Sequence, residues 1–154
     1  MALRNIVKKG DPILNKVCRP VEKFDDRLAQ LIDDMAETLA KSGGVGLAAP
    51  QVGMLRRVVV IDVGEGLIEL VNPKIKSKSG RQYTVEGCLS CPDYWGYTTR
   101  PKVVTVEAYD RNGELKTYKG KDLLAKAFCH ELDHLGGHLF TEIIEERVDP
   151  KDLK

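Results

Sequence analysis

The sequence predicts an α+β fold, with antiparallel or mixed β-sheets around a buried helix and one N-terminal amphipathic helix. Three observations carry this prediction. Apolar residues repeat with a helical period near the N-terminus, and an apolar segment of helical length lies near the C-terminus. Between them, extended segments follow one another and are joined by turn residues. Because strands do not alternate with helices, the pattern favours α+β over parallel βαβ units.

The first helix is predicted to begin after Phe24 and Asp25, which provide a hydrophobic staple and an N-cap. Its apolar stripe follows a spacing of three and four residues, and it is expected to end at Ser42-Gly43-Gly44. This stripe is formed by Leu28, Leu31, Ile32, Met35 and Leu39. The segment before it, residues 6–20, is expected to be irregular.

Extended segments occupy the middle of the chain. Strands are predicted at residues 57–63, 67–71, 102–109 and 114–118. The first of these is apolar throughout, which predicts burial on both faces. The second is expected to end at Asn72-Pro73, and the extended path to continue through Ile75 toward a turn at residues 77–80 (Ser-Lys-Ser-Gly). Residues 110–113 (Asp-Arg-Asn-Gly) predict a hairpin turn. The charged tail after Ile144 is expected to be loose at its end.

The late helix is predicted over residues 122–135, with Asp122 as N-cap and Gly136-Gly137 as the stop. It contains His130-Glu131-Leu132-Asp133-His134. Residues four apart lie on the same face of a helix, so both histidines can bind one metal ion. Glu131 stands beside them, where a carboxylate can act as a base toward water. The predicted buried helix is therefore also a metal-binding helix.

A catalytic site of this kind needs a third protein ligand. One zincin subclass would place a histidine at position 140, where this chain has Phe140. Downstream carboxylates are available beyond the helix, at Glu142, Glu145 and Glu146. Cys88 is the better candidate because a thiolate suits Zn(II) or Fe(II). A closed site using Cys91 as well stays open as a non-catalytic, metal-stabilised alternative.

Composition limits the classes of protein. A chain of 154 residues fits a single domain over residues 1–154, and its contents of 42% apolar and 31% charged residues are those of an ordinary globular protein. The net charge of +1 with scattered basic residues argues against nucleic-acid or anionic-membrane partners. The sequence has neither a membrane-spanning run nor a signal peptide, so the four cysteines are expected to be reduced in the cytoplasm.

A glycine-rich segment, residues 43–51, lies between the first helix and the first long strand. Its glycines permit close approach of another chain to the backbone. A phosphate-binding loop is disfavoured because the Lys-Ser/Thr ending of that loop is missing.

Three segments occur in one order: Gly44-Val45-Gly46-Leu47-Ala48-Ala49-Pro50-Gln51, Glu86-Gly87-Cys88-Leu89-Ser90 and His130-Glu131-Leu132-Asp133-His134. Together they resemble the three motifs of the peptide deformylase family, bacterial metalloenzymes that remove the formyl group from the initiator methionine of new proteins. The resemblance covers nearly the whole chain. It departs from the usual pattern at Cys91, Trp95 and Cys129, none of which is a catalytic position.

The resemblance implies a role for each matching residue. Cys88, His130 and His134 would bind one divalent metal, with Fe(II) expected in the cell and Zn(II), Ni(II) or Co(II) able to replace it. Glu131 would be the general base. The side-chain amide of Gln51 and the backbone N–H of Leu89 would stabilise the oxyanion. The runner-up activity is that of a zincin-type metallopeptidase.

The same resemblance implies how substrate binds. The expected partners are formyl-methionyl N-termini of nascent polypeptides near the ribosome. Their backbone would lie along Gly44, Val45 and Gly46 as an added strand. The methionine pocket would be formed by Val45, Glu86, Leu123 and Ala127, each of which could instead be core. Arg100 is expected to pair with Asp133 or Glu86, and His138 to be exposed rather than ligating.

Overall fold

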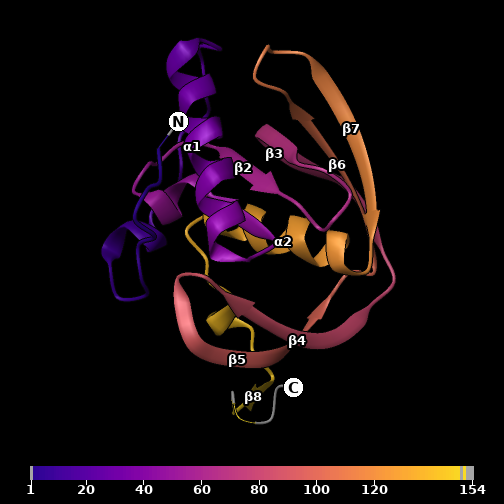
Figure 1. Ribbon diagram of the computed structural model, residues 1–154. Coiled ribbons are helices and arrows are strands. Elements are labelled where there is room, and N and C mark those ends of the chain that lie inside the picture. Colours follow the sequence, from indigo (N-terminus) through magenta and orange to yellow (C-terminus); the bar gives the residue numbers. More distant parts are fainter. Residues whose placement is uncertain (1, 150, 152–154) are drawn as a thin grey trace.

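The computed structural model describes residues 2–149 and 151 of the chain (Figure 1). Its helices are α1 (Asp26–Ser42) and α2 (Leu123–Leu135), with short 3-10 turns η1 (Pro12–Asn15), η2 (Ala49–Val52) and η3 (Phe140–Glu142). Its strands are β1 (Gly46–Ala48), β2 (Val58–Ile61), β3 (Ile68–Ser79), β4 (Gln82–Cys88), β5 (Cys91–Arg100), β6 (Val103–Tyr109), β7 (Leu115–Lys121) and β8 (Glu146–Val148).

Two antiparallel sheets enclose helix α2. The larger has the strand order β1-β2-β3-β6-β7, and the smaller has the order β4-β5-β8. Figure 1 shows α2 at the centre, with the β4–β5 hairpin curving beneath it and α1 on the other side of the large sheet. Core clusters on the two faces of that sheet contain residues of α2 and of α1, respectively. The predicted α+β class, with sheets around a buried helix, is confirmed.

Helix α1 has the limits that its sequence predicts. The Asp25 carboxylate accepts a hydrogen bond from the backbone N–H of Leu28 at 3.0 Å, which satisfies one of the free donors at the N-terminus. Gly43 ends the helix in the left-handed conformation, with φ of 75°. The apolar stripe is buried against β2 and neighbouring elements, so the prediction of an amphipathic helix is confirmed.

Helix α2 covers the predicted segment, but Asp122 does not cap it with its side chain. Asp122 has a positive φ of 55°, and its carboxylate pairs with Lys102 at 2.8 Å. The turn from β7 into the helix points this side chain away from the free N–H groups, so that part of the prediction is wrong. The helix ends at Gly136 as predicted. At Gly137, where φ is 82°, a Cβ would lie 2.7 Å from the Asn15 carbonyl oxygen.

Strand β3 is longer than predicted, because it passes through Asn72-Pro73 instead of ending there. Asn72 adopts a φ of 50°, and its side-chain amide exchanges hydrogen bonds with the backbone of Val21 at 2.7 and 2.9 Å. These bonds replace strand pairing at an irregularity in the ladder between β3 and β6. The strand then resumes beyond the bulge.

The smaller sheet was not predicted as strands. Its β4 and β5 contain Gly87, Pro92 and Gly96, which weaken a strand pattern. Part of the charged tail forms β8 (residues 146–148), which pairs with β5. Residues 150 and 152–154, to which the expected looseness of the end of the tail applies, lie outside the described residues.

Candidate active site and metal centre

Three side chains from two elements converge beneath the large sheet. Cys88 ends β4, whereas His130 and His134 lie one helical turn apart on α2. One ligand atom of each lies within 4.8 Å of the others, and Cys88 Sγ is 3.4 Å from His134 Nε2. Two donors that share a tetrahedral ion, with bonds of about 2.3 and 2.1 Å, stand roughly 3.5 Å apart. The thiolate and two imidazoles therefore fit a divalent metal.

A network of charges fixes the orientation of His130. Its Nδ1 is hydrogen-bonded to Glu86 Oε2, which leaves Nε2 free as a ligand atom. Glu86 also accepts hydrogen bonds from Thr98 Oγ1 at 2.7 Å and from Arg100 Nε and Nη2 at 3.0 and 2.7 Å. Arg100 Nη1 reaches Asp133 at 2.7 Å, so the expected ion pair forms with both carboxylates.

The same network sets the charge states of these groups. Burial alone would raise the pKa of Glu86, but hydrogen bonds from His130 and Arg100 hold it well below its ordinary value. Burial and the neighbouring His130 lower the pKa of His134 to about 3. His134 is therefore neutral at pH 7, which is the form of histidine that binds metals.

Glu131 stands beside the ligand group without being part of it. Its Oε2 lies 3.8 Å from His130 Nε2, and its Oε1 has no hydrogen-bond partner among the described residues. Burial raises the pKa of this carboxyl to about 7. A base that titrates near neutral pH is well matched to proton transfer under cellular conditions. A carboxylate in this position can accept a proton from a water molecule beside the ligand group.

Gln51 is buried beside Cys88. Its Oε1 accepts a hydrogen bond from the backbone N–H of Ala48 at 2.9 Å. This contact directs the NH₂ group toward Ser90 Oγ at 3.1 Å and Cys88 Sγ at 3.6 Å. The amide is therefore held with its NH₂ donor beside the Cys88 sulfur. Leu89 follows Cys88 in the hairpin connection and lines the cavity.

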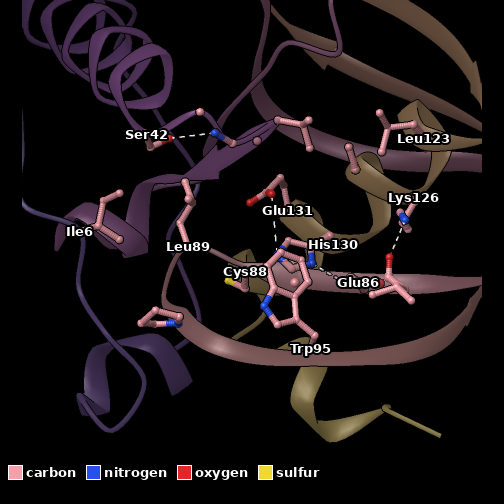
Figure 2. Close-up of a pocket in the computed structure, with 18 of the residues that line it drawn as sticks. Ile6, Ser42, Glu86, Cys88, Leu89, Trp95, Leu123, Lys126, His130 and Glu131 are labelled. Carbon is pink, nitrogen blue, oxygen red and sulfur yellow. Dashed lines mark hydrogen bonds and ion pairs between the residues drawn. The ribbon is translucent and has the colours of Figure 1, made fainter. Parts of the chain in front are cut away.

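A cavity of about 700 Å³ opens onto Cys88, His130 and Glu131, whereas Gln51 and His134 lie behind its lining residues (Figure 2). All residues predicted to bind substrate line it, together with Cys88, Leu89, His130 and Glu131. The predicted residues are Gly44, Val45, Gly46, Glu86, Leu123 and Ala127. Val45 and Leu123 are exposed, which argues against the alternative that they are core. The Glu86 carboxylate, in contrast, is bonded to His130 and Arg100 rather than directed at a ligand.

The large sheet leaves one edge free beside this cavity. Strand β1 pairs only with β2 in the described strand order, and Gly44 and Val45 lead directly into it. Such an edge presents backbone groups that an extended peptide can pair with. The glycine-rich segment therefore offers a strand-addition surface, and its small residues allow close approach.

The other candidate ligands lie elsewhere. His138 is exposed and faces Glu142 at 3.2 Å, which matches the expectation that it is not a ligand. Phe140 packs near the His130 ring, with centroids 5.9 Å apart. Glu145 bonds to Thr99, and Glu146 is exposed in β8. Cys91 is buried next to Cys88 but is not among the atoms that converge with the two histidines.

Sequence reasoning gave no site role to Trp95 or Lys126, although both line the cavity. The Trp95 ring lies against Gly87, where a Cβ would be 2.2 Å from its Cζ3. Lys126 donates from Nζ to Thr84 Oγ1 and to the Val85 carbonyl oxygen, both at 3.0 Å (Figure 2 shows the latter). For Lys126, the only indication in the sequence of a role in the site was its position among the apolar residues of the helix.

Comparison with known proteins identifies the family. The model of the polypeptide deformylase family matches residues 3–149. The chain belongs to the polypeptide deformylase family. A peptide deformylase from Acetivibrio thermocellus is 53% identical over 154 residues, covering 100% of this chain and 91% of the relative. A peptide deformylase from Caldicellulosiruptor bescii is 51% identical, covering 100% and 93%.

Solved deformylase structures have the same fold. The peptide deformylase from Thermotoga maritima has a TM-score of 0.92 at 38% identity, covering 94% of this chain and 99% of that one. The enzyme from Synechococcus elongatus, solved in complex with actinonin, has a TM-score of 0.90 at 37% identity, covering 93% and 79%. Membership confirms the predicted activity, deformylation of N-terminal formyl-methionine, over the alternative of a zincin-type metallopeptidase. The deformylase family consists of metalloenzymes, in agreement with the cysteine and histidine group described above.

Proposed function

We propose that the cavity around Cys88, His130 and His134 is where this chain removes the formyl group. The supporting observation is that these three donors converge with Glu131 beside them and a free sheet edge at the mouth of the cavity. Residues 1–154 act as one catalytic unit in this proposal. The products are formate and a free N-terminal methionine.

Cys88, His130 and His134 hold one divalent metal, which we infer to be Fe(II) in the cell. The donor set of one soft thiolate and two imidazoles accepts Fe(II), Zn(II), Ni(II) or Co(II). A metal held there would supply Lewis-acid chemistry, which activates water at neutral pH and polarises a carbonyl.

Glu131 moves the protons. It takes a proton from the attacking water and later gives it to the leaving amine of methionine, so one carboxylate serves as base and then as acid. Its burial at the cavity wall keeps bulk water away from this transfer. Glu86 keeps His130 in the orientation that presents Nε2, and thus acts as a positioning residue.

Negative charge that develops on the formyl oxygen is stabilised by two donors. Gln51 Nε2 is held on the Cys88 side of the site by the bond from Ala48 to its other amide atom. The backbone N–H of Leu89 supplies the second donor. Donors fixed in advance lose little free energy to reorganisation during the reaction.

Substrate enters as an extended chain along Gly44, Val45 and Gly46 and extends the sheet at β1. Its methionine side chain occupies the part of the cavity formed by the exposed Val45 and Leu123 and the buried Ala127, whose apolar surfaces suit a thioether. Formyl-methionyl N-termini of nascent polypeptides near the ribosome are the natural substrates. We place the reaction in the bacterial cytoplasm. No helix in the described part of the chain is long and apolar enough to cross a membrane.

Formate release from a formyl-Met peptide tests the proposal. Protein loaded anaerobically with Fe(II) or Ni(II) should turn over, and Glu131→Gln should retain the metal but lose at least about 100-fold in kcat. Glu107→Gln changes a carboxylate that pairs with Lys74 on β3 and serves as the matched control. Cys88→Ala should lose the metal. Retained metal in that variant, or cleavage of unformylated peptides, would instead support a zincin-type peptidase.

A further inference from the structure

Cys88 and Cys91 face each other across the tightest turn of the small sheet. They are Cα partners in the ladder between β4 and β5, and only Leu89 and Ser90 connect them. Side chains directly opposite in an antiparallel pair share one face of the sheet, with Cβ atoms about 4.5–5.5 Å apart. A disulfide requires about 3.5–4.5 Å, so a movement of roughly 1 Å would join the two sulfurs.

The two thiols differ in access. Cys88 lines the cavity, so a small oxidant that enters with solvent reaches its sulfur. Cys91 is only 3% exposed and packs with Leu14, Leu139 and Phe140. Reaction with an oxidant therefore begins at Cys88, with Cys91 next to it.

We propose that Cys91 is a resolving cysteine that converts oxidation of Cys88 into a reversible disulfide. Hydrogen peroxide is the oxidant. The Cys88 thiolate attacks one peroxide oxygen, the O–O bond breaks, and Cys88 sulfenic acid and water form. The Cys91 sulfur then attacks Cys88 sulfur and displaces a second water, so two thiols and one peroxide give one disulfide and two waters. A dithiol reductant restores both thiols.

This disulfide would remove one of three metal donors. The inference rests on the proposed function, in which Cys88 binds the metal. A site left with two imidazoles loses its metal, so peroxide switches the enzyme off. Without Cys91, the sulfenic acid has no neighbouring thiol and goes on to sulfinic acid, which dithiols do not reduce. Cys91 therefore protects the ligand from irreversible loss.

Zinc-loaded protein treated with one molar equivalent of peroxide tests the proposal, because Zn(II) is redox-inert and only the protein is oxidised. Mass spectrometry of non-reduced peptides measures the Cys88–Cys91 link, and a chromogenic chelator measures released zinc. In the unmodified protein, the two should rise together. Dithiothreitol followed by zinc should restore the metal.

Cys91→Ala and Cys91→Val are the test variants, and the second keeps apolar volume if the first folds poorly. Each should form no disulfide, accumulate Cys88 sulfinic acid at higher peroxide and regain at least about 5-fold less zinc after reduction. Cys18→Ala removes a buried thiol from a different cluster and should behave as the unmodified protein. Sulfinic acid without disulfide in the unmodified protein, or equal zinc recovery in the Cys91 variants, would overturn the proposal.

The zinc content of Cys88→Ser separates this inference from the proposed function. If that variant binds zinc as tightly as the unmodified protein, the ligand set of the proposed function is wrong. If it loses zinc while the unmodified protein forms no disulfide, only the role of Cys91 is wrong. If the disulfide forms while zinc is retained, the proposal that the disulfide releases the metal is wrong.

Discussion

The carboxylate of Glu131 lies against the backbone of Gly46. A Cβ built on Gly46 would stand 2.6 Å from Glu131 Oε2 and 2.9 Å from its Cγ. The Glu131 carboxylate therefore occupies its position only because residue 46 has no side chain. This contact connects the glycine-rich segment to the helix that carries the histidines.

Gly46→Ala should displace the Glu131 carboxylate and lower kcat by about 100-fold, because a misplacement of about 1 Å at a catalytic group has effects of that size. Metal content should be unchanged, since the atoms nearest to the added methyl group all belong to Glu131 and not to the three ligand residues. Gly136→Ala is the control, because its Cβ would meet neighbours only at 3.4 Å or more. Equal kcat in the two variants would show that Glu131 tolerates movement.

Glu86→Gln should weaken metal binding by about 10–100-fold, because it removes the charge that orients His130 and pairs with Arg100. Competition with a metal chelator gives the dissociation constant. Asp133→Asn breaks the other Arg100 ion pair, whose carboxylate is 40% exposed, and should have a much smaller effect. A similar loss in both variants would assign the effect to Arg100 rather than to the histidine.

Gln51→Glu is a nearly isosteric change that keeps an acceptor for the Ala48 N–H and removes the NH₂ donor. It should lower kcat by about 100–1000-fold with little change in KM, because the lost bond strengthens only as charge develops on the substrate. Steady-state kinetics with a formyl-Met peptide separate the two constants. A rise in KM at constant kcat would instead make Gln51 a ground-state binding residue.

The Asp34 carboxylate makes the free energy of unfolding depend on pH in the acid range. Burial would raise its pKa, but hydrogen bonds from Ala2, Gln30 and Arg4 hold the pKa below the ordinary value. A lowered folded-state pKa contributes stability above the unfolded value of about 3.9, and this stability is lost as pH falls through the folded value.

Asp34→Asn should therefore lower Tm by about 2–4 °C at pH 7, with the difference shrinking below about pH 4. Thermal melts of both proteins across that range measure it. Glu22→Gln, at an exposed residue, provides the comparison. A Tm difference that does not change with pH would mean that the amide disturbs packing rather than removing a charge.

Local sequence patterns predict the helices, because helical spacing and capping residues involve only neighbouring positions in the chain. His130, Glu131 and His134 are placed by helical spacing alone, and α1 by its cap and stripe. The approach of Cys88 to that helix depends on the β4–β5 hairpin curving beneath α2, which no local pattern encodes. From residue chemistry alone, several ligand sets therefore stayed open, and the family resemblance selected among them.

The misplaced strands have a similar cause. Strand β3 continues past Asn72-Pro73 because the Asn72 side chain binds the backbone of Val21, a contact across distant parts of the chain. The β4 and β5 strands contain residues that usually break strands, and they are stabilised by pairing with each other and by packing over α2. Long-range contacts thus override the local signals.

Under the proposed binding mode, the edge of β1, which has no second neighbour in the described part of the chain, also limits when the enzyme can act. A peptide that completes this sheet must offer several residues of backbone whose hydrogen bonds are still unused. Once a new protein has incorporated its own N-terminus into a helix or sheet, those groups are taken. Under this binding mode, removal of the formyl group competes with folding of the substrate, and N-terminal segments that fold late would be processed most completely.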